Sequence, residues 1–298
     1  MLYLSNRRSF LRFAATLPVL AIFSRTSAQS PDDAETKLAN LEKSFGLRLG
    51  LFALDTATDQ QVRHRADERF PLLSTFKVMA VAAVLKRSES ELGLLSQRIR
   101  YNKSNLVTYS PITEKHLASG MTVAELCAAA LQYSDNTAGN LLIRLIGSPL
   151  RVTEFAQKTG NNAFRLDRWE THLNTAIPGD QRDTATPESM ARSLRAFAFG
   201  NALSPLTKAQ LVEWLRGNTT GDKRIRAAVP DSWIVGDKTG SGDYGAANDI
   251  ALIWPPNRAP IVLAIYTTHN QADAKRSDEA IVETTRIVLN GLGVRQLG

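Results

Sequence analysis

The feature that most constrains this fold is a run of eight apolar residues from Val78 to Leu85, which follows Ser74 and Lys77. No polar residue interrupts the run, so it predicts a helix that is buried on all sides. Pro71 and Ser74 stand where the entry to such a helix is expected. The pattern therefore places Ser74 in the first turn of a central helix, with Lys77 one turn later on the same face.

The placement of Ser74 and Lys77 fits a catalytic pair. A hydroxyl in a first helical turn lies among free backbone N–H groups, at the positive end of the helix dipole, where an oxyanion is stabilised. A partly desolvated lysine beside it loses its proton readily and can act as a base toward the hydroxyl. The alternative is a helix-capping serine beside a solvated lysine, because Ser-x-x-Lys is a loose pattern.

The first 28 residues have the pattern of an export signal. The pair Arg7-Arg8 precedes an apolar region from 13 to 23, which is too short to span a bilayer as a permanent helix. The paired arginines, followed by Phe-Leu, resemble a twin-arginine signal, and an ordinary secretory signal is the alternative. We expect cleavage after Ala28 and a periplasmic or secreted protein without a permanent membrane anchor.

Composition argues against several classes of function. The formal net charge is +7, but four arginines and no acid in the first 28 residues account for more than half of it. No Lys/Arg cluster interleaves with aromatic residues, so we expect no nucleic-acid partner. The four histidines lack metal-ligand spacing, and neither a metal nor a cofactor is expected. Cys127, the only cysteine, lies in an apolar helical run and is expected to be a buried, inert thiol.

The order of the predicted elements indicates an α/β protein with an inserted helical domain. After a helix marked by Leu38, Leu41 and Phe45, strand patterns cover 47–54, 60–64, 232–238, 248–254 and 261–267. Helical patterns fill the middle of the chain, at 122–131, 137–146, 149–159, 187–199 and 208–216, and a last helix spans 278–289. We expect one sheet domain (29–72 and 217–298) and one helical domain (73–216), with a site between them.

The tripeptide Ser134-Asp135-Asn136 adds two polar groups between helical stretches. Ser134 offers a hydroxyl that can pass a proton, and Asn136 an amide that can hold a substrate carbonyl or the Lys77 ammonium. Asp135 is expected to fix the turn through backbone hydrogen bonds. A plain turn is the alternative.

The segment from Lys238 to Gly242, Lys-Thr-Gly-Ser-Gly, stands at the end of a strand pattern. A lysine, two hydroxyls and close backbone approach at the glycines suit a carboxylate and an oxyanion hole. A glycine turn with a solvated lysine is the alternative.

A polar loop from Arg168 to Asp183 contains Glu170 and Asn174. A carboxylate and an amide four residues apart can hold one water between them, with the carboxylate as its general base. Arg168 and Asp183 have opposite charges and are expected to clamp the loop ends together. An ordinary solvated loop is the alternative.

Together these segments resemble the class A serine β-lactamases, whose signature is Ser-x-x-Lys, Ser-Asp-Asn and Lys-Thr-Gly. All three occur here in the family's order, with the Glu-bearing loop between the second and the third. The resemblance covers essentially the whole chain after residue 28. It implies a mostly antiparallel sheet domain built from both chain ends and flanked by helices, with an inserted all-helical domain. It also implies hydrolysis of the β-lactam ring of penicillins and cephalosporins, which confers antibiotic resistance. We expect the protein to act on these small molecules as a monomer.

The resemblance also implies a role for each matching residue. Ser74 would be the nucleophile, with Lys77 a base in acylation, and Ser134 would protonate the lactam nitrogen. Glu170, helped by Asn174, would activate the water that hydrolyses the acyl-enzyme. The backbone N–H groups of Ser74 and of one further residue, Ser241, would form the oxyanion hole. Substrate-binding residues would be Asn136, Lys238, Thr239, Ser241, Arg224 and Tyr109. Whether Lys77 or Glu170 is the acylation base stays open from the sequence.

Three positions depart from common family patterns. Leu73 and Gly242 stand where some carbapenemases pair two cysteines, which does not favour carbapenem hydrolysis of that type. Cys127 has no partner for the disulfide that many relatives carry. In many relatives a proline follows the catalytic Glu, and Thr171 holds that position here. In the family, the peptide bond after this Glu is often cis. The alternatives to a hydrolase are a penicillin-binding peptidase and a β-lactam receptor, and of the three only the hydrolase needs Glu170.

Overall fold

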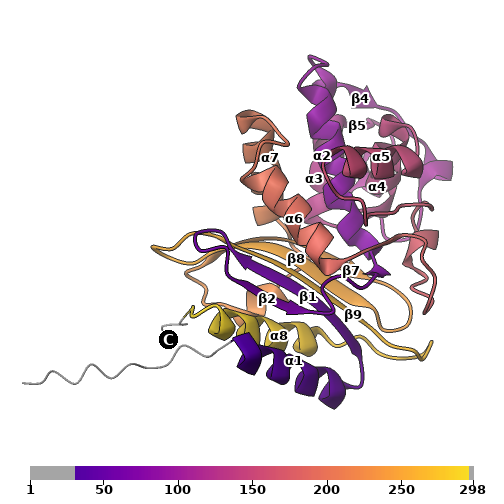
Figure 1. The fold of residues 1–298 in the computed structure, drawn as a ribbon. Coiled ribbons are helices and arrows are strands. Elements are labelled where there is room, and N and C mark those ends of the chain that lie inside the picture. The colour runs from indigo at the N-terminus through magenta and orange to yellow at the C-terminus, as the bar shows by residue number, and fades with distance from the viewer. Residues whose placement is uncertain (1–30, 295–298) are drawn as a thin grey trace, which may run out of the picture.

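The two ends of the chain build one five-stranded sheet in which every neighbouring pair is antiparallel (Figure 1). The computed structural model describes residues 31–294. The strand order is β2-β1-β9-β8-β7, so two strands from the N-terminal part lie beside three from the C-terminal part. This confirms the predicted sheet, whose strands are β1 (Arg48–Asp55), β2 (Gln61–His64), β7 (Ile234–Ser241), β8 (Ala247–Trp254) and β9 (Ile261–Thr268).

Two helices from opposite ends of the chain cover one face of this sheet, α1 (Pro31–Phe45) and α8 (Asp278–Gly291). They lie side by side below the strands in Figure 1. Leu38 of α1 and Leu289 of α8 are fully buried in the core that they form with the sheet. The α8 helix begins where predicted, because the Ser277 hydroxyl accepts a hydrogen bond from the Ala280 N–H (3.1 Å).

The middle of the chain is helical, as predicted, and packs on the other face of the sheet (Figure 1). Its helices are α2 (Phe76–Ser88), α3 (Val123–Gln132), α4 (Asn136–Ile146), α5 (Pro149–Lys158), α6 (Pro187–Ala198) and α7 (Pro205–Arg216). Helix α2 is the centre of this part: no residue from Val78 to Leu85 exceeds 4% exposure. The uninterrupted apolar run thus forms a helix with other helices on all sides.

One hydrophobic core joins the helices to the sheet. Val81 of α2 and Phe197 of α6 belong to the same buried cluster as Phe52 and Val262 of the sheet. Helix α6 lies directly against β1 and β9. The division into a sheet domain and a helical domain stays a prediction, and the shared core means that the two parts support one another where they meet.

Short elements complete the chain. Two small ladders pair β3 (Phe70–Pro71) with β6 (Thr184–Ala185) and β4 (Arg98–Ile99) with β5 (Met121–Thr122). Single turns of 3₁₀ helix are η1 (Leu73–Thr75), η2 (Leu94–Ser96), η3 (Lys103–Asn105), η4 (Thr113–His116), η5 (His172–Asn174) and η6 (Ile225–Ala228). Ser74 therefore lies in the 3₁₀ turn that leads into α2, and Lys77 in the first turn of α2 itself.

The predicted end of strand 232–238 was wrong. Strand β7 continues to Ser241, because Lys238, Thr239, Gly240 and Ser241 all pair with β8. Cross-strand pairing outweighs the turn preference of the Thr-Gly-Ser sequence. The Lys-Thr-Gly segment is therefore part of β7, an edge strand of the sheet, in which successive side chains point to opposite faces.

Two further predictions concern burial and export. Cys127 is fully buried in α3, as expected, and burial raises the pKa of its thiol. Within residues 31–294, no helix combines the length and apolar character needed to cross a membrane. The predicted export signal lies outside the residues that the structure describes.

Candidate active site

Ser74 is held in a tight turn between the sheet and α2. Leu73, before it, has a positive φ of 49°, a conformation that L-residues rarely adopt. The Leu72 N–H donates to the Asp183 carbonyl (2.8 Å), and the Thr75 hydroxyl donates back to the Leu72 carbonyl (2.5 Å). These bonds fix the backbone on both sides of Ser74, which is 7% exposed.

Lys77 lies fully buried at the centre of the site. Its Nζ is 2.8 Å from Ser74 Oγ, 2.9 Å from the Ser134 carbonyl and 2.7 Å from Asn136 Oδ1. A carboxylate oxygen of Glu170 is 2.9 Å away. Burial lowers the pKa of Lys77, and the Glu170 charge opposes that shift. The sequence prediction that Lys77 is a desolvated lysine beside Ser74 is confirmed.

Helix α4 brings the Ser-Asp-Asn segment to Lys77. Asp135 caps the helix by accepting from the Ala138 N–H (2.8 Å), and it also accepts from the Thr113 N–H (2.9 Å). This confirms its predicted role in fixing the turn. Gly139 makes room for the lysine, since a Cβ there would lie 2.9 Å from Lys77 Cε.

A second buried lysine enters the site from β7. Lys238 Nζ donates to Ser134 Oγ (2.9 Å) and to the Thr239 carbonyl (2.7 Å). Burial lowers the pKa of Lys238 well below the usual value for lysine, and the charge of Lys77 lowers it further. The hydroxyl of Ser134 thus lies directly against a lysine that can supply or share a proton.

Arg224 supports the outer end of β7. It is 4% exposed, and its Nη1 donates to the carbonyls of Gly240 and Asn248, both at 2.7 Å. Its Nη2 donates to Ser241 Oγ (2.7 Å), and its Nε to Asp278 (2.8 Å). Two hydroxyls meet nearby, because Thr239 Oγ1 and Thr220 Oγ1 are 2.6 Å apart. This end of the site gathers cations and hydroxyls suited to a carboxylate.

Glu170 joins the nucleophile to the polar loop. Ser74 Oγ donates to Glu170 Oε1 (3.4 Å), and Asn174 Nδ2 donates to Glu170 Oε2 (2.5 Å). Asn140 of α4 binds the backbone of Glu170 at both its carbonyl (3.0 Å) and its N–H (2.9 Å). The Glu170–Thr171 peptide is cis, as the resemblance implies.

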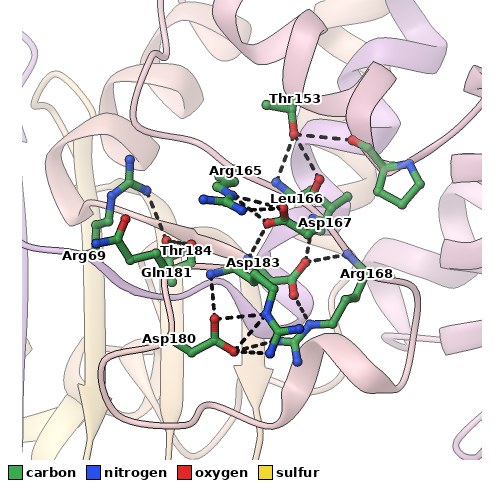
Figure 2. A network of polar contacts seen from close by, with 12 residues as sticks. Arg69, Thr153, Arg165, Leu166, Asp167, Arg168, Asp180, Gln181, Asp183 and Thr184 are labelled. Atoms are coloured by element: carbon green, nitrogen blue, oxygen red, sulfur yellow. Dashed lines mark hydrogen bonds and ion pairs between the residues drawn. The ribbon is translucent and has the colours of Figure 1, made fainter.

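The predicted clamp at the loop ends is present (Figure 2). Arg168 Nε donates to Asp183 Oδ2 (2.5 Å), while Asp183 Oδ1 accepts from the N–H groups of Asp167 (2.7 Å) and Arg168 (2.8 Å). Asp180 adds a longer contact to Arg168 (3.6 Å). The Asp183 side chain is 1% exposed, so this ion pair is largely shielded from water.

Beside Ser74 lies a cleft of about 590 Å³. Most predicted site residues line it, namely Ser74, Tyr109, Ser134, Asn136, Asn174, Arg224, Thr239 and Ser241. Tyr109 is 57% exposed, at the mouth. Lys77, Glu170 and Lys238 are buried beside the cleft, whereas the loop clamp lies outside its lining.

The sequence prediction missed several polar residues of the site: Asn140, Thr220, Arg276 and Asp278. One signal was available for the first of them, because Asn140 stands one helical turn after Asn136, on the same face of α4. The others come from separate segments whose meeting no local pattern reveals.

Comparison with known proteins decides the family. The model described as "Beta-lactamase enzyme family" matches residues 33–292. The chain belongs to this family. It is a class A serine β-lactamase, a hydrolase that opens β-lactam rings through a serine acyl-enzyme and so confers resistance to these antibiotics.

Relatives of this β-lactamase match it over nearly its whole length. Beta-lactamase OXY-1 from Klebsiella oxytoca is 56% identical over 292 residues, which cover 98% of this chain and 100% of that protein. Beta-lactamase Toho-1 from Escherichia coli is 54% identical over 291 residues, with the same coverage. A crystal structure of a beta-lactamase from Desulfarculus baarsii superimposes with a TM-score of 0.88 at 52% identity, covering 90% of this chain and 100% of that one.

Proposed function

We propose that Ser74 attacks the β-lactam carbonyl with Lys77 as its base. The supporting observation is that the Lys77 amine, the Ser74 hydroxyl and the Glu170 carboxylate are all within 3.4 Å of one another. A shift of one proton from Lys77 to Glu170 leaves a neutral amine with two N–H groups and one lone pair. The two N–H groups suit the Ser134 carbonyl and Asn136 Oδ1, which can only accept, and rotation about the Cε–Nζ bond turns the lone pair from Glu170 toward the Ser74 hydroxyl.

In the same proposal, the β7 side of the cleft binds the substrate and completes acylation. The N–H groups of Ser74 and Ser241 stabilise the developing oxyanion. Lys238, with Thr239, Ser241 and Arg224, recognises the substrate carboxylate. Ser134, which accepts a hydrogen bond from Lys238, passes its own proton to the lactam nitrogen as the ring opens. Asn136 and Tyr109 hold the substrate side chain.

Deacylation is assigned to Glu170 and Asn174. Their side chains are joined at 2.5 Å, and Glu170 reaches Ser74, so a water held by both lies near the ester. Asn174 Oδ1 is among the few buried polar side-chain atoms of residues 31–294 that lack a hydrogen-bond partner, and it is free to accept from that water. Before this step the proton held by Glu170 replaces, by way of Lys77, the one that Ser134 gave to the lactam nitrogen, so Glu170 is a carboxylate again. Glu170 then removes the proton of the water as it attacks and gives it to Ser74 Oγ as the ester breaks.

The direct test of this function is turnover of a chromogenic cephalosporin by the purified enzyme. We expect steady hydrolysis in the wild type and loss of it in Ser74→Ala. A wild-type protein that instead stays acylated for hours would indicate a receptor or a penicillin-binding protein.

The loop clamp should control deacylation without touching the substrate. Asp183→Ala removes the partner of Arg168 and the one oxygen that accepts from two backbone N–H groups, so we expect Glu170 to lose its fixed position and deacylation to slow about 10-fold or more. Stopped-flow measurement of the deacylation rate checks this. Asp55→Ala, which removes the buried partner of Arg258 away from the cleft, is the matched control. Penicillin hydrolysis at the wild-type rate in Asp183→Ala would refute the clamp.

The lowered pKa of Lys238 predicts the alkaline limit of activity. Carboxylate binding needs the charged lysine, which is present below its pKa and lost as pH rises through it. Since burial and Lys77 depress that pKa, kcat/KM should fall at a lower pH than the titration of an exposed lysine. Lys238→Arg keeps its charge and should move this fall to higher pH. Superimposable pH profiles of the two enzymes would contradict the assignment.

We also propose export to the periplasm or medium by the twin-arginine route, on the pattern of Arg7-Arg8 followed by Phe-Leu. Changing both arginines to lysine preserves charge, so a general secretory signal should tolerate it, whereas twin-arginine export should fail. Cell fractionation measures the outcome, and normal accumulation of the double variant outside the cytoplasm counts against this route.

The residues that line the cleft all come from one chain, which supports action as a monomer. Light scattering should then give the mass of one chain.

A further inference from the structure

Asn248 is a fully buried amide beside the cleft that the proposed mechanism leaves without a role. It lies on β8, directly opposite Gly240 of β7. Its Nδ2 donates to the carbonyls of Pro71 (2.7 Å) and Leu72 (3.1 Å). Among residues 31–294, its Oδ1 is one of the few buried side-chain atoms with no hydrogen-bond partner. A half-satisfied amide in a core is costly, which argues for a purpose beyond packing.

The two carbonyls that Asn248 binds come immediately before the turn of Ser74. Leu72 is already held at its N–H by Asp183, so the donation from Asn248 fixes the other side of that residue. Because its N–H and its carbonyl are both hydrogen-bonded, Leu72 fixes the direction of the backbone that leads through Leu73, whose φ is positive, to Ser74.

Asn248 also pairs with β7, the strand that carries Lys238 and Ser241. Gly240, its partner in β7, lies so near the turn that a Cβ there would be 3.2 Å from the Ser74 nitrogen. The backbone carbonyl of Asn248 accepts from Arg224 (2.7 Å), which in turn binds Ser241. One residue thus contacts both the nucleophile turn and the arginine at the outer end of β7.

We propose that Asn248 is a positioning residue that fixes the Ser74 turn against β7, so that the N–H groups of Ser74 and Ser241 point at one oxygen. The proposal rests on the assigned roles of Ser74 and Ser241. Removing the amide keeps the contact between Ser74 and Lys77 but lets the turn that carries Ser74 shift relative to β7. Since a single lost oxyanion donor costs about 10²–10³-fold, a displaced one should cost about 10–10²-fold in acylation.

The test compares Asn248→Leu with Asn161→Leu. Asn161 is likewise a buried amide, 4% exposed, which donates to the Ser189 carbonyl (3.1 Å) and to Ser193 Oγ (2.9 Å) far from Ser74 in the chain. We expect the acylation rate, counted per acylated active site, to fall about 10–10²-fold in Asn248→Leu and less than about twofold in Asn161→Leu. Asn248→Asp, which keeps the shape but loses the donor, should behave like Asn248→Leu.

Infrared spectroscopy of the acyl-enzyme separates positioning from a structural role. Each variant is combined with Glu170→Gln, acylated with benzylpenicillin, and the ester carbonyl band is recorded. Weaker oxyanion hydrogen bonds should move the band to higher wavenumber in Asn248→Leu, with no shift in Asn161→Leu. An unshifted band with wild-type acylation would overturn the proposal, as would failure of both Asn248 variants to fold. A wild-type enzyme that is never acylated would instead refute the mechanism.

Discussion

Replacing Glu170 by glutamine should cut steady-state penicillin hydrolysis by about 10²–10⁴-fold, because glutamine keeps the shape but cannot act as a general base. Acylation still has the Ser74 hydroxyl and the amine of Lys77, which are 2.8 Å apart. Burial lowers the pKa of Lys77 and the Glu170 charge opposes this, so the loss of that charge favours the neutral amine without a proton transfer to residue 170. The first turnover should therefore appear as a burst of about one product per active site, followed by slow release. Stopped-flow absorbance measures the burst and the slow phase separately.

The matched control for this variant is Glu91→Gln. Glu91 forms an exposed ion pair with Arg87 near the C-terminal end of α2 and has no contact with the cleft. Its replacement should leave both phases unchanged. Full turnover in Glu170→Gln would remove Glu170 from the mechanism.

Replacing Lys77 by methionine should give the opposite kinetic pattern. The variant loses the base for Ser74 and a buried partner of Glu170, so acylation should slow by about 10²–10⁴-fold. No acyl-enzyme should accumulate, since formation of the ester is then slower than its hydrolysis. Single-turnover kinetics with enzyme in excess gives the acylation rate directly.

Lys86→Met on the same helix is the control, because Lys86 is an exposed lysine paired with Glu89. Circular dichroism should show that both variants fold, and rates are compared per active site. Acylation of Lys77→Met at the wild-type rate would make Glu170 the base. The contrast between the two variants therefore resolves the choice that the sequence left open.

The fold could be predicted because short stretches of the sequence are enough to indicate its main helices and strands. The run from Val78 to Leu85 has no polar stripe, and it is buried on all sides. Helix α8 begins at a capping serine, Ser277, as its sequence indicates. Strand patterns at both chain ends pointed to one sheet. The end of β7 was missed, because Thr239, Gly240 and Ser241 resemble a turn locally and are held as a strand only by pairing with β8.

The site could be predicted in its parts but not in its contacts. Ser74 and Lys77 are three residues apart, in the 3₁₀ turn that leads into α2 and in the first turn of α2, whereas Lys238 reaches Ser134 across 104 residues of sequence. Asp278 was missed because it binds the side chain of Arg224, and Asn248 because it binds a backbone carbonyl. Such supporting residues carry no motif of their own, since their function is the position of another group.

The most direct test of the mechanism is to locate the covalent adduct. Glu170→Gln is mixed with benzylpenicillin and digested with trypsin, which should cut after Arg69 and after Lys77. Mass spectrometry with fragmentation then examines the peptide Phe70–Lys77, which holds Ser74 and Thr75 as its hydroxyl residues. We predict an increase of one penicillin mass on Ser74, absent from Ser74→Ala. Substrate consumption without any adduct, or an adduct on another residue, would contradict the serine acyl-enzyme assigned to Ser74.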